Sequence, residues 1–187
     1  MRVPELDRGL VTDSGVFSND RIDPGTGVLL RVAPPPPPKG NVLDLGCGYG
    51  PIAVTLALRA PDVTVWGVDV NRRALGLLKQ NAERYALANV VAATSEEVPS
   101  DLRFDAIYSN PPVRVGKEAM RSLLLGWLAR LVPSGHAYLV VKRNLGADSL
   151  AEWLTGQGFP TTRLRSKQGY RVLDTENAAG GNVHDAS

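Results

Sequence analysis

Short apolar runs alternate along the chain with segments in which apolar residues recur at helical spacing. The runs predict buried strands over 41–45, 63–70, 90–93, 104–109 and 136–141. The helical spacing predicts helices over 51–60, 72–85, 117–131 and 149–156. A closing β-hairpin is expected over 161–173, with its turn near Gln168 and Gly169. This alternation favours an α/β fold built on an open, mostly parallel sheet.

Polar features fall where several of these strands end. In open α/β sheets, ligands bind beyond the carboxyl ends of the strands. A glycine-rich loop follows the first strand, Asp69 ends the second, and the sequence Asn-Pro-Pro at 110–112 follows the fourth. We therefore expect one ligand site at this edge of the sheet.

The composition divides the chain into four parts. Residues 1–32 form an N-terminal arm expected to cover the ligand site, with Asp23 and Pro24 starting a short helix. Residues 33–40 are proline-rich and predict a stiff polyproline II spacer, which could also be a site for a proline-recognition domain. The main domain spans 41–174. The polar, Gly- and Ala-rich residues 175–187 are typical of a disordered tail.

Composition also excludes several classes of protein. The 187 residues are 43% hydrophobic and 21% charged, which fits one globular domain, and no apolar run approaches the ~20 residues of a membrane span. The first residues show no secretory signal, and the single cysteine, Cys47, cannot form an internal disulfide, so we expect a cytoplasmic protein. One cysteine and two distant histidines predict no metal site. A net charge of +2 leaves nucleic-acid binding open.

The loop at 44–50, DLGCGYG, has glycines that let a ligand approach the backbone closely. A dinucleotide-binding fingerprint needs Gly or Ala at the place of Pro51, which disfavours a nicotinamide dehydrogenase. Asp44, two residues before the first glycine, suits a ligand with a positive end better than a pyrophosphate. A plain glycine turn is the alternative.

Asp69 is placed where a carboxylate can accept hydrogen bonds from both hydroxyls of a ribose. The alternative is that Asp69 caps the following helix, a role that Asn71 could fill instead.

Together these residues resemble the class I S-adenosylmethionine-dependent methyltransferases, over about 42–173. The resemblance implies a doubly wound, mostly parallel, seven-stranded Rossmann-like methyltransferase sheet with a C-terminal antiparallel hairpin. It also implies that Asp44 contacts the methionine part of the cofactor and that Asp69 holds its ribose. Thr94 or Ser95 stands where the family often has an acid that binds adenine. The implied cofactor-binding residues are Thr26, Asp44, Gly46, Gly48, Gly50, Asp69, Val70, Thr94, Ser95 and Asn110.

The Asn-Pro-Pro sequence has a chemical interpretation in this setting. An exocyclic amine is a poor nucleophile because its lone pair is delocalised, and two acceptors on its N–H groups can direct that lone pair at the sulfonium methyl. The side-chain oxygen of Asn110 and the carbonyl of Pro111 can be those acceptors, while the prolines, including Pro112, keep the backbone extended. The structural alternative is a turn that ends the strand.

Three segments, 13–30, 110–118 and 168–173, resemble small-domain methyltransferases related to the ribosomal RNA guanine-N2 enzymes. The resemblance implies methylation of guanine N2, with ribosomal RNA or a ribosomal subunit as partner. Many relatives have Phe or Tyr at the place of Val113, where an aromatic ring could stack on the base. The residues expected to contact substrate or RNA are Val113, Arg114, Lys117 and Arg171.

Other functions stay open at this point. Protein glutamine methylation is disfavoured by Val113, because those relatives usually carry Asn-Pro-Pro-Tyr. A non-catalytic module that binds S-adenosylmethionine or RNA is disfavoured by the intact Asn-Pro-Pro sequence. The basic residues of the terminal hairpin could form a phosphate-binding surface or an ordinary solvated face.

Overall fold

The computed structural model describes residues 3–12, 22–112 and 116–178. Its α-helices are α1 (Pro24–Val32), α2 (Pro51–Arg59), α3 (Arg72–Arg84), α4 (Lys117–Leu128) and α5 (Ala147–Gly156). Its strands are β1 (Gly40–Leu45), β2 (Val63–Val68), β3 (Val90–Ala93), β4 (Phe104–Ser109), β5 (Leu131–Lys142), β6 (Thr161–Lys167) and β7 (Tyr170–Glu176). Two short 3-10 turns, η1 (Ser95–Glu97) and η3 (Arg143–Leu145), follow β3 and β5.

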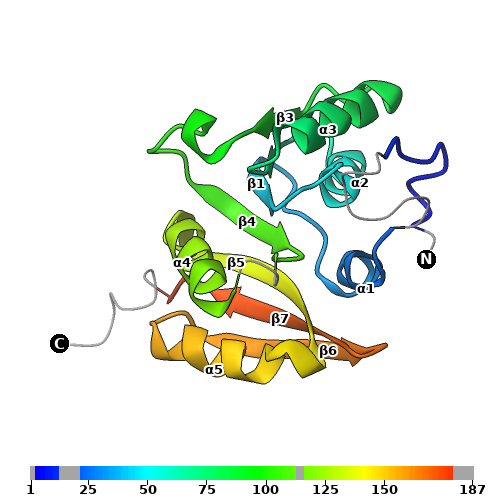
Figure 1. Cartoon of the computed structure of the whole chain (residues 1–187). Coiled ribbons are helices and arrows are strands. Elements are labelled where there is room, and N and C mark those ends of the chain that lie inside the picture. Colours follow the sequence, from blue (N-terminus) through cyan, green and yellow to red (C-terminus); the bar gives the residue numbers. More distant parts are fainter. Residues whose placement is uncertain (1–2, 13–21, 113–115, 179–187) are drawn as a thin grey trace.

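The strands form one seven-stranded sheet in the order β3-β2-β1-β4-β5-β7-β6 (Figure 1). Strands β1 to β5 are parallel to one another, whereas β7 runs antiparallel to both β5 and β6. This topology confirms the expected doubly wound sheet with a C-terminal hairpin. The chain passes from β3 to β4 across β1, so the strand order reverses between β1 and β4. Ligands of open α/β sheets bind at such a switch point.

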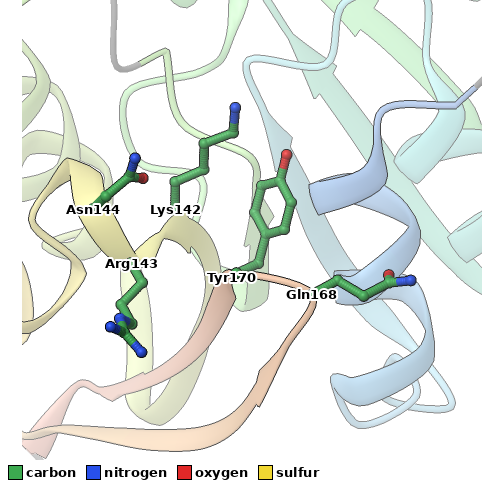
Figure 2. Close-up of a pocket in the computed structure, with 6 residues that line it drawn as sticks. Lys142, Arg143, Asn144, Gln168 and Tyr170 are labelled. Carbon is green, nitrogen blue, oxygen red and sulfur yellow. The ribbon is translucent and has the colours of Figure 1, made fainter.

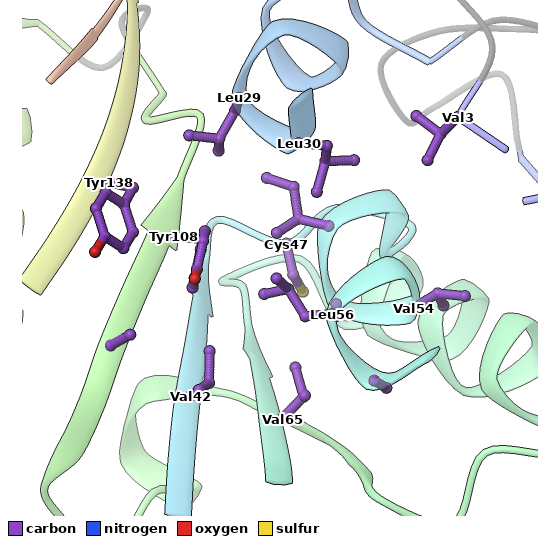
Figure 3. Packing of buried hydrophobic residues seen from close by; sticks show 14 of the residues in the cluster. Val3, Leu29, Leu30, Val42, Cys47, Val54, Leu56, Val65, Tyr108 and Tyr138 are labelled. Carbon is purple, nitrogen blue, oxygen red and sulfur yellow. The ribbon is translucent and has the colours of Figure 1, made fainter. Parts of the chain in front are cut away.

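Helices cover both faces of the sheet, and each face has its own hydrophobic cluster. Helices α1, α2 and α3 lie over one face, where residues such as Leu29, Leu56 and Tyr108 are buried (Figure 3). Helices α4 and α5 cover the other face with residues such as Leu124 and Leu154. Neighbouring strand residues alternate between the two clusters, as the period of two along a strand requires.

The N-terminal arm packs into the same core as the sheet. Val28, Leu29 and Leu30 of α1 are almost fully buried. Nearer the N-terminus, the Arg59 guanidinium forms an ion pair of 2.7 Å with Glu5. Val11 exchanges backbone hydrogen bonds with the side chain of Asn81 on α3, whose Nδ2 also donates to the carbonyl of Tyr49 in the glycine loop. The described part of the arm is therefore attached beside the glycine loop.

Several boundaries differ from the sequence expectation: β2 ends at Val68 rather than at residue 70, and two further differences change which element a residue belongs to. The apolar spacing predicted α4 to reach residue 131, but α4 ends at Leu128, and Leu131 instead begins β5 by pairing with Phe104. The tail was expected from residue 175, but β7 continues to Glu176, because Thr175 is buried and pairs with Ala137. In both places strand pairing, which local sequence does not encode, sets the boundary. The hairpin turn at 168–169 lies where it was predicted.

Candidate active site at the carboxyl ends of β1 and β4

The glycine loop and the Asn-Pro-Pro sequence meet at the switch point. Leu45 and Ser109 end two paired strands, and the Ser109 hydroxyl donates a hydrogen bond of 2.7 Å to the carbonyl of Leu45. Just beyond, a Cβ placed on Gly46 would lie 3.8 Å from Cδ of Pro112. Two motifs 64 residues apart in sequence are thus held side by side.

The glycine loop has a conformation and a packing that glycine alone allows. Gly50 has φ +90° at the N-terminus of α2, and a Cβ there would lie 2.2 Å from Cδ1 of Leu78. The backbone N–H groups of Gly46 and Cys47 both donate to the carbonyl of Val68 on the neighbouring strand. The loop is therefore held against β2 and α3.

Asp44 is a fully buried carboxyl group beneath the N-terminus of α2. Its Oδ2 accepts a hydrogen bond of 2.9 Å from the backbone N–H of Ala53. Its Oδ1 is also buried and has no hydrogen-bond partner among the described residues. Burial, reinforced by the nearby charge of Asp69, raises the pKa of Asp44 to about 8. A buried acceptor of this kind fits a ligand that brings its own N–H donors and positive charge.

Asp69 lies half-buried at the end of β2 and braces the loop. Its Oδ2 accepts from the N–H of Gly48 at 2.9 Å, and its Oδ1 accepts from the N–H of Asn71 at 2.9 Å. The Asn71 side chain caps α3 by accepting from the N–H groups of Arg73 and Ala74, so Asp69 is not the helix cap. Each carboxylate oxygen keeps a second lone pair for a ligand hydroxyl. Val70, which follows, is an apolar side chain with 89% of its surface exposed.

Thr94 and Ser95 follow β3, two strands away from β1. Thr94 is buried, and its backbone N–H donates to Oε2 of Glu97 at 2.7 Å, while Ser95 is exposed. These residues lie at the same edge of the sheet as Asp44 and Asp69, because β1, β2 and β3 are parallel.

Asn110 is held by two side chains of the arm. Its Nδ2 donates to Oδ1 of Asp23 at 2.9 Å and to Oγ1 of Thr26 at 3.1 Å. Because an ionised carboxylate can only accept, the amide nitrogen must face Asp23, and this fixes the orientation of the amide. The amide oxygen is then the atom that can accept a hydrogen bond from a ligand. Asp23 is itself oriented by the N–H groups of Gly25 and Thr26, which both donate to the same Oδ1.

The remaining expected site residues are distributed unevenly. Pro111 is buried and Pro112 half-buried beside the glycine loop, whereas Val113 and Arg114 lie outside the described residues. Lys117 is exposed in the first turn of α4. Arg171 forms an ion pair with Asp148, and only 12% of its side chain is exposed. A phosphate would therefore have to compete with Asp148 for this guanidinium.

Sequence reasoning missed the role of Asp23, which it interpreted only as the start of a helix. The bond from Asn110 to Asp23 spans 87 positions, and no local pattern encodes it. The one available signal was the sequence Asp-Pro-Gly-Thr-Gly at 23–27, in which a helix begins with two glycines that leave room for close neighbours.

Within 3–12, 22–112 and 116–178, no group of His, Cys, Asp and Glu is arranged to hold a metal ion. No helix in these segments has the length and apolar character needed to cross a bilayer. The candidate site consists of the carboxyl groups of Asp44 and Asp69, the loop glycines and the amide of Asn110 at one sheet edge.

This fold and site define a class I S-adenosylmethionine-dependent methyltransferase. The unpartnered buried oxygen of Asp44 fits the amino group of that cofactor, and the carboxylate of Asp69 fits its ribose. The chain belongs to the methyltransferase small-domain family, whose model matches residues 7–174.

Three relatives show how far the similarity extends. The protein YbxB of Bacillus subtilis is 34% identical over 175 residues, covering 92% of this chain and 87% of YbxB. The ribosomal RNA small subunit methyltransferase C of Klebsiella pneumoniae is 36% identical over 168 residues, covering 88% of this chain and 49% of that protein. The structure of the T. thermophilus 16S rRNA N2 guanine methyltransferase RsmC with AdoMet and guanosine matches with a TM-score of 0.73 and 31% identity, covering 87% of this chain and 45% of that chain.

The length of the match differs among these relatives. The chain spans most of YbxB but about half or less of the curated ribosomal RNA methyltransferases that it matches.

Proposed function

We propose that this methyltransferase transfers the methyl group to the exocyclic N2 amine of guanine in ribosomal RNA. The observation that supports it most is the fixed amide of Asn110, whose nitrogen is held by Asp23 and Thr26. An acceptor locked in this way costs no reorganisation when the substrate amine arrives. Two similar proteins support this substrate. The K. pneumoniae relative is named as a ribosomal RNA methyltransferase, and the T. thermophilus relative is named as an enzyme that methylates guanine N2 in 16S rRNA.

The cofactor supplies an electrophilic methyl group on its sulfonium, and the residues of the chain supply the geometry. Asp44, Asp69, Val70 and the loop glycines would hold the cofactor, and Thr94 and Ser95 would contact its adenine. The Asn110 oxygen and the Pro111 carbonyl accept the two N–H groups of the amine, and its lone pair then faces the methyl carbon. When bound, the cofactor would give its methyl group to this nitrogen as the sulfur–carbon bond breaks, and the amine would then lose one proton to solvent. Orientation rather than a strong base provides the rate enhancement.

Ribosomal RNA from cells that lack this protein tests the proposal. We expect one guanine to have lost 14 mass units, a single methyl group, and incubation with the purified protein and S-adenosylmethionine to restore it. RNA with an unchanged methylation map, together with methylation of a glutamine-containing peptide, would contradict the proposed substrate. Comparison of naked RNA with assembled subunits identifies the physical form that is recognised.

A further inference from the structure

A hollow of about 320 Å³ lies at the end of β5, next to the candidate active site. It is lined on one side by Lys142, Arg143 and Asn144, and on the other by Gln168, Gly169 and Tyr170 of the hairpin (Figure 2). None of these residues is used by the cofactor site. The lining combines two cations, two amides and one phenol, and contains no carboxylate.

Lys142 and Tyr170 form a pair across the two strands. They are register partners in β5 and β7, and the Lys142 ammonium lies 5.8 Å from the centre of the Tyr170 ring. Figure 2 shows the ammonium and the phenol oxygen pointing in the same direction. Burial and the nearby charge of Asp23 raise the pKa of Tyr170, so the phenol stays protonated at neutral pH and can donate. The two tips therefore present adjacent donors, which suits an anion.

The pair belongs to the same face of the sheet as Asn110. Tyr108 and Val140 both face the α1 side, and residues two further along a strand face the same way, which places Asn110 and Lys142 on that side too. Ser109 pairs with Leu139, and Lys142 is three residues further along β5. The Cα atoms of Ser109 and Lys142 are therefore about 11 Å apart. The hollow is therefore beside the site of the target amine.

Tyr170 also packs against the N-terminal arm that holds Asn110. A Cβ on Gly25 would lie 2.7 Å from Cε1 of the Tyr170 ring, so the ring lies directly against α1. Gly25 donates its N–H to the same Asp23 oxygen that holds Asn110. A ligand on Tyr170 thus lies close to the amide that would orient the target base.

The surroundings of the hollow are basic. Strand β6 is the outer strand of the sheet, and nearly all of its residues are exposed, including Arg163, Arg165 and Lys167. Among the described residues, no carboxylate lies within salt-bridge distance of these three cations or of Lys142. Arg165 and Lys167 pair with Val172 and Tyr170 and so lie on the same face as Lys142, whereas a bulge puts Arg163, the partner of Leu173, on the opposite face. Two cations without a salt-bridge partner beside Lys142 suit a long polyanion better than a single small anion.

We infer that Lys142 and Tyr170 bind the phosphate of the nucleotide adjoining the methylated guanine, with Asn144 beside them and the β6 edge continuing the path of the RNA. The inference rests on the proposed function, because it takes RNA as the substrate. Phosphate contacts of this kind fix the position of the strand without reading its sequence. They would supply the phosphate contact that Arg171 was expected to make, since the Arg171 guanidinium is already paired with Asp148.

Binding of an unmodified 16S ribosomal RNA transcript over a range of KCl concentrations tests this inference. Lys142→Gln removes one phosphate-binding charge, so binding should weaken roughly three- to tenfold at moderate salt, and the slope of log affinity against log salt should fall by about 0.7. Tyr170→Phe keeps the ring against Gly25 and removes only the hydroxyl. It should weaken binding without changing the slope, because a neutral donor releases no counterion.

Lys79→Gln is the matched control. Lys79 is an exposed lysine on α3, the helix on the β2–β3 side of the sheet, away from β6. Its loss should leave affinity and slope at parental values, and all three variants should bind S-adenosylmethionine as the parent does. If Lys142→Gln behaves like Lys79→Gln while the parent binds and methylates the transcript, the phosphate site is wrong and the proposed function stands. If the parent binds neither the transcript nor the small ribosomal subunit from cells that lack this protein, even at low salt, the RNA substrate and the phosphate site are both wrong.

Discussion

The pH dependence of cofactor binding follows from the burial of Asp44. Its carboxyl group is fully buried with a pKa of about 8, so the ligand-free protein holds it protonated at neutral pH. The amino group of S-adenosylmethionine is a cation below about pH 7.5 and is best bound by a carboxylate. If Asp44 binds this group, it has to lose its proton as the cofactor enters.

The size of the effect follows from proton linkage. With a pKa of about 8, the ionised fraction of Asp44 rises about 30-fold between about pH 5.5 and 7.0. The dissociation constant for the cofactor should therefore fall about 30-fold over this range, while the amino group stays charged. Binding at about pH 6.5 should release close to one proton. The same raised pKa makes the ligand-free protein less stable as pH rises from about 4 towards 8, because the unfolded chain gives up the proton first.

Calorimetry in two buffers with different ionisation enthalpies measures both the affinity and the released proton. Asp44→Asn is the control, since its amide keeps an acceptor for the Ala53 N–H but cannot titrate. It should bind the cofactor more weakly and show an affinity that is flat with pH. A parental dissociation constant that changes less than about twofold between pH 5.5 and 7.0 would refute the assignment of Asp44 to the amino group.

Three further substitutions test other parts of the site. Asp69→Ala should weaken cofactor binding by a factor equivalent to about 1–3 kcal/mol in calorimetry, because ribose hydroxyls lose their acceptors; unchanged affinity in a folded variant would remove Asp69 from the site. Gly50→Ala should lower the free energy of unfolding by about 1–3 kcal/mol in chemical denaturation, because its φ of +90° and the contact with Leu78 both oppose a Cβ; parental stability would disprove this packing. Asp23→Ala should lower the single-turnover methylation rate, since the Asn110 amide becomes free to rotate, and should cost about 1 kcal/mol of stability through the lost cap of α1. A parental rate with the expected stability loss would limit Asp23 to its capping role.

Local patterns predicted the parts of the fold that depend on neighbouring residues. Strands β3 and β4 have the predicted bounds, because each is a short apolar run with clear ends. The length of β5 was missed, since Leu131 joins it only by pairing with Phe104 of β4. A periodicity of apolar residues cannot distinguish the last turn of a helix from the first residue of the next strand.

The sequence indicated the candidate site residues but not the contacts that orient them. Asp44, Asp69 and Asn110 could be proposed from the sequence because each lies at or just beyond the carboxyl end of a strand, and the parallel sheet brings such ends together. The orientation of the Asn110 amide was not predictable, because it depends on Asp23, the N-cap of α1, and on Thr26 in that helix, both more than 80 residues away. The pairing of Arg171 with Asp148 was equally hidden, since charge alone does not reveal which cations are already neutralised.

Single-turnover methylation by Asn110→Ala tests the central claim most directly. The substrate is ribosomal RNA from cells that lack the protein, and the affinity of the variant for the cofactor is measured separately. If Asn110 orients the target amine, its loss should slow methyl transfer by about 10²–10³-fold, because the interaction belongs to the transition state. Cofactor affinity should change far less, because Asp44 and Asp69 remain. Asn110→Asp keeps an acceptor oxygen beside a changed charge and should retain part of the rate. Methyl transfer by Asn110→Ala at the parental rate would contradict the account and would make the Asn-Pro-Pro sequence only the turn that ends β4.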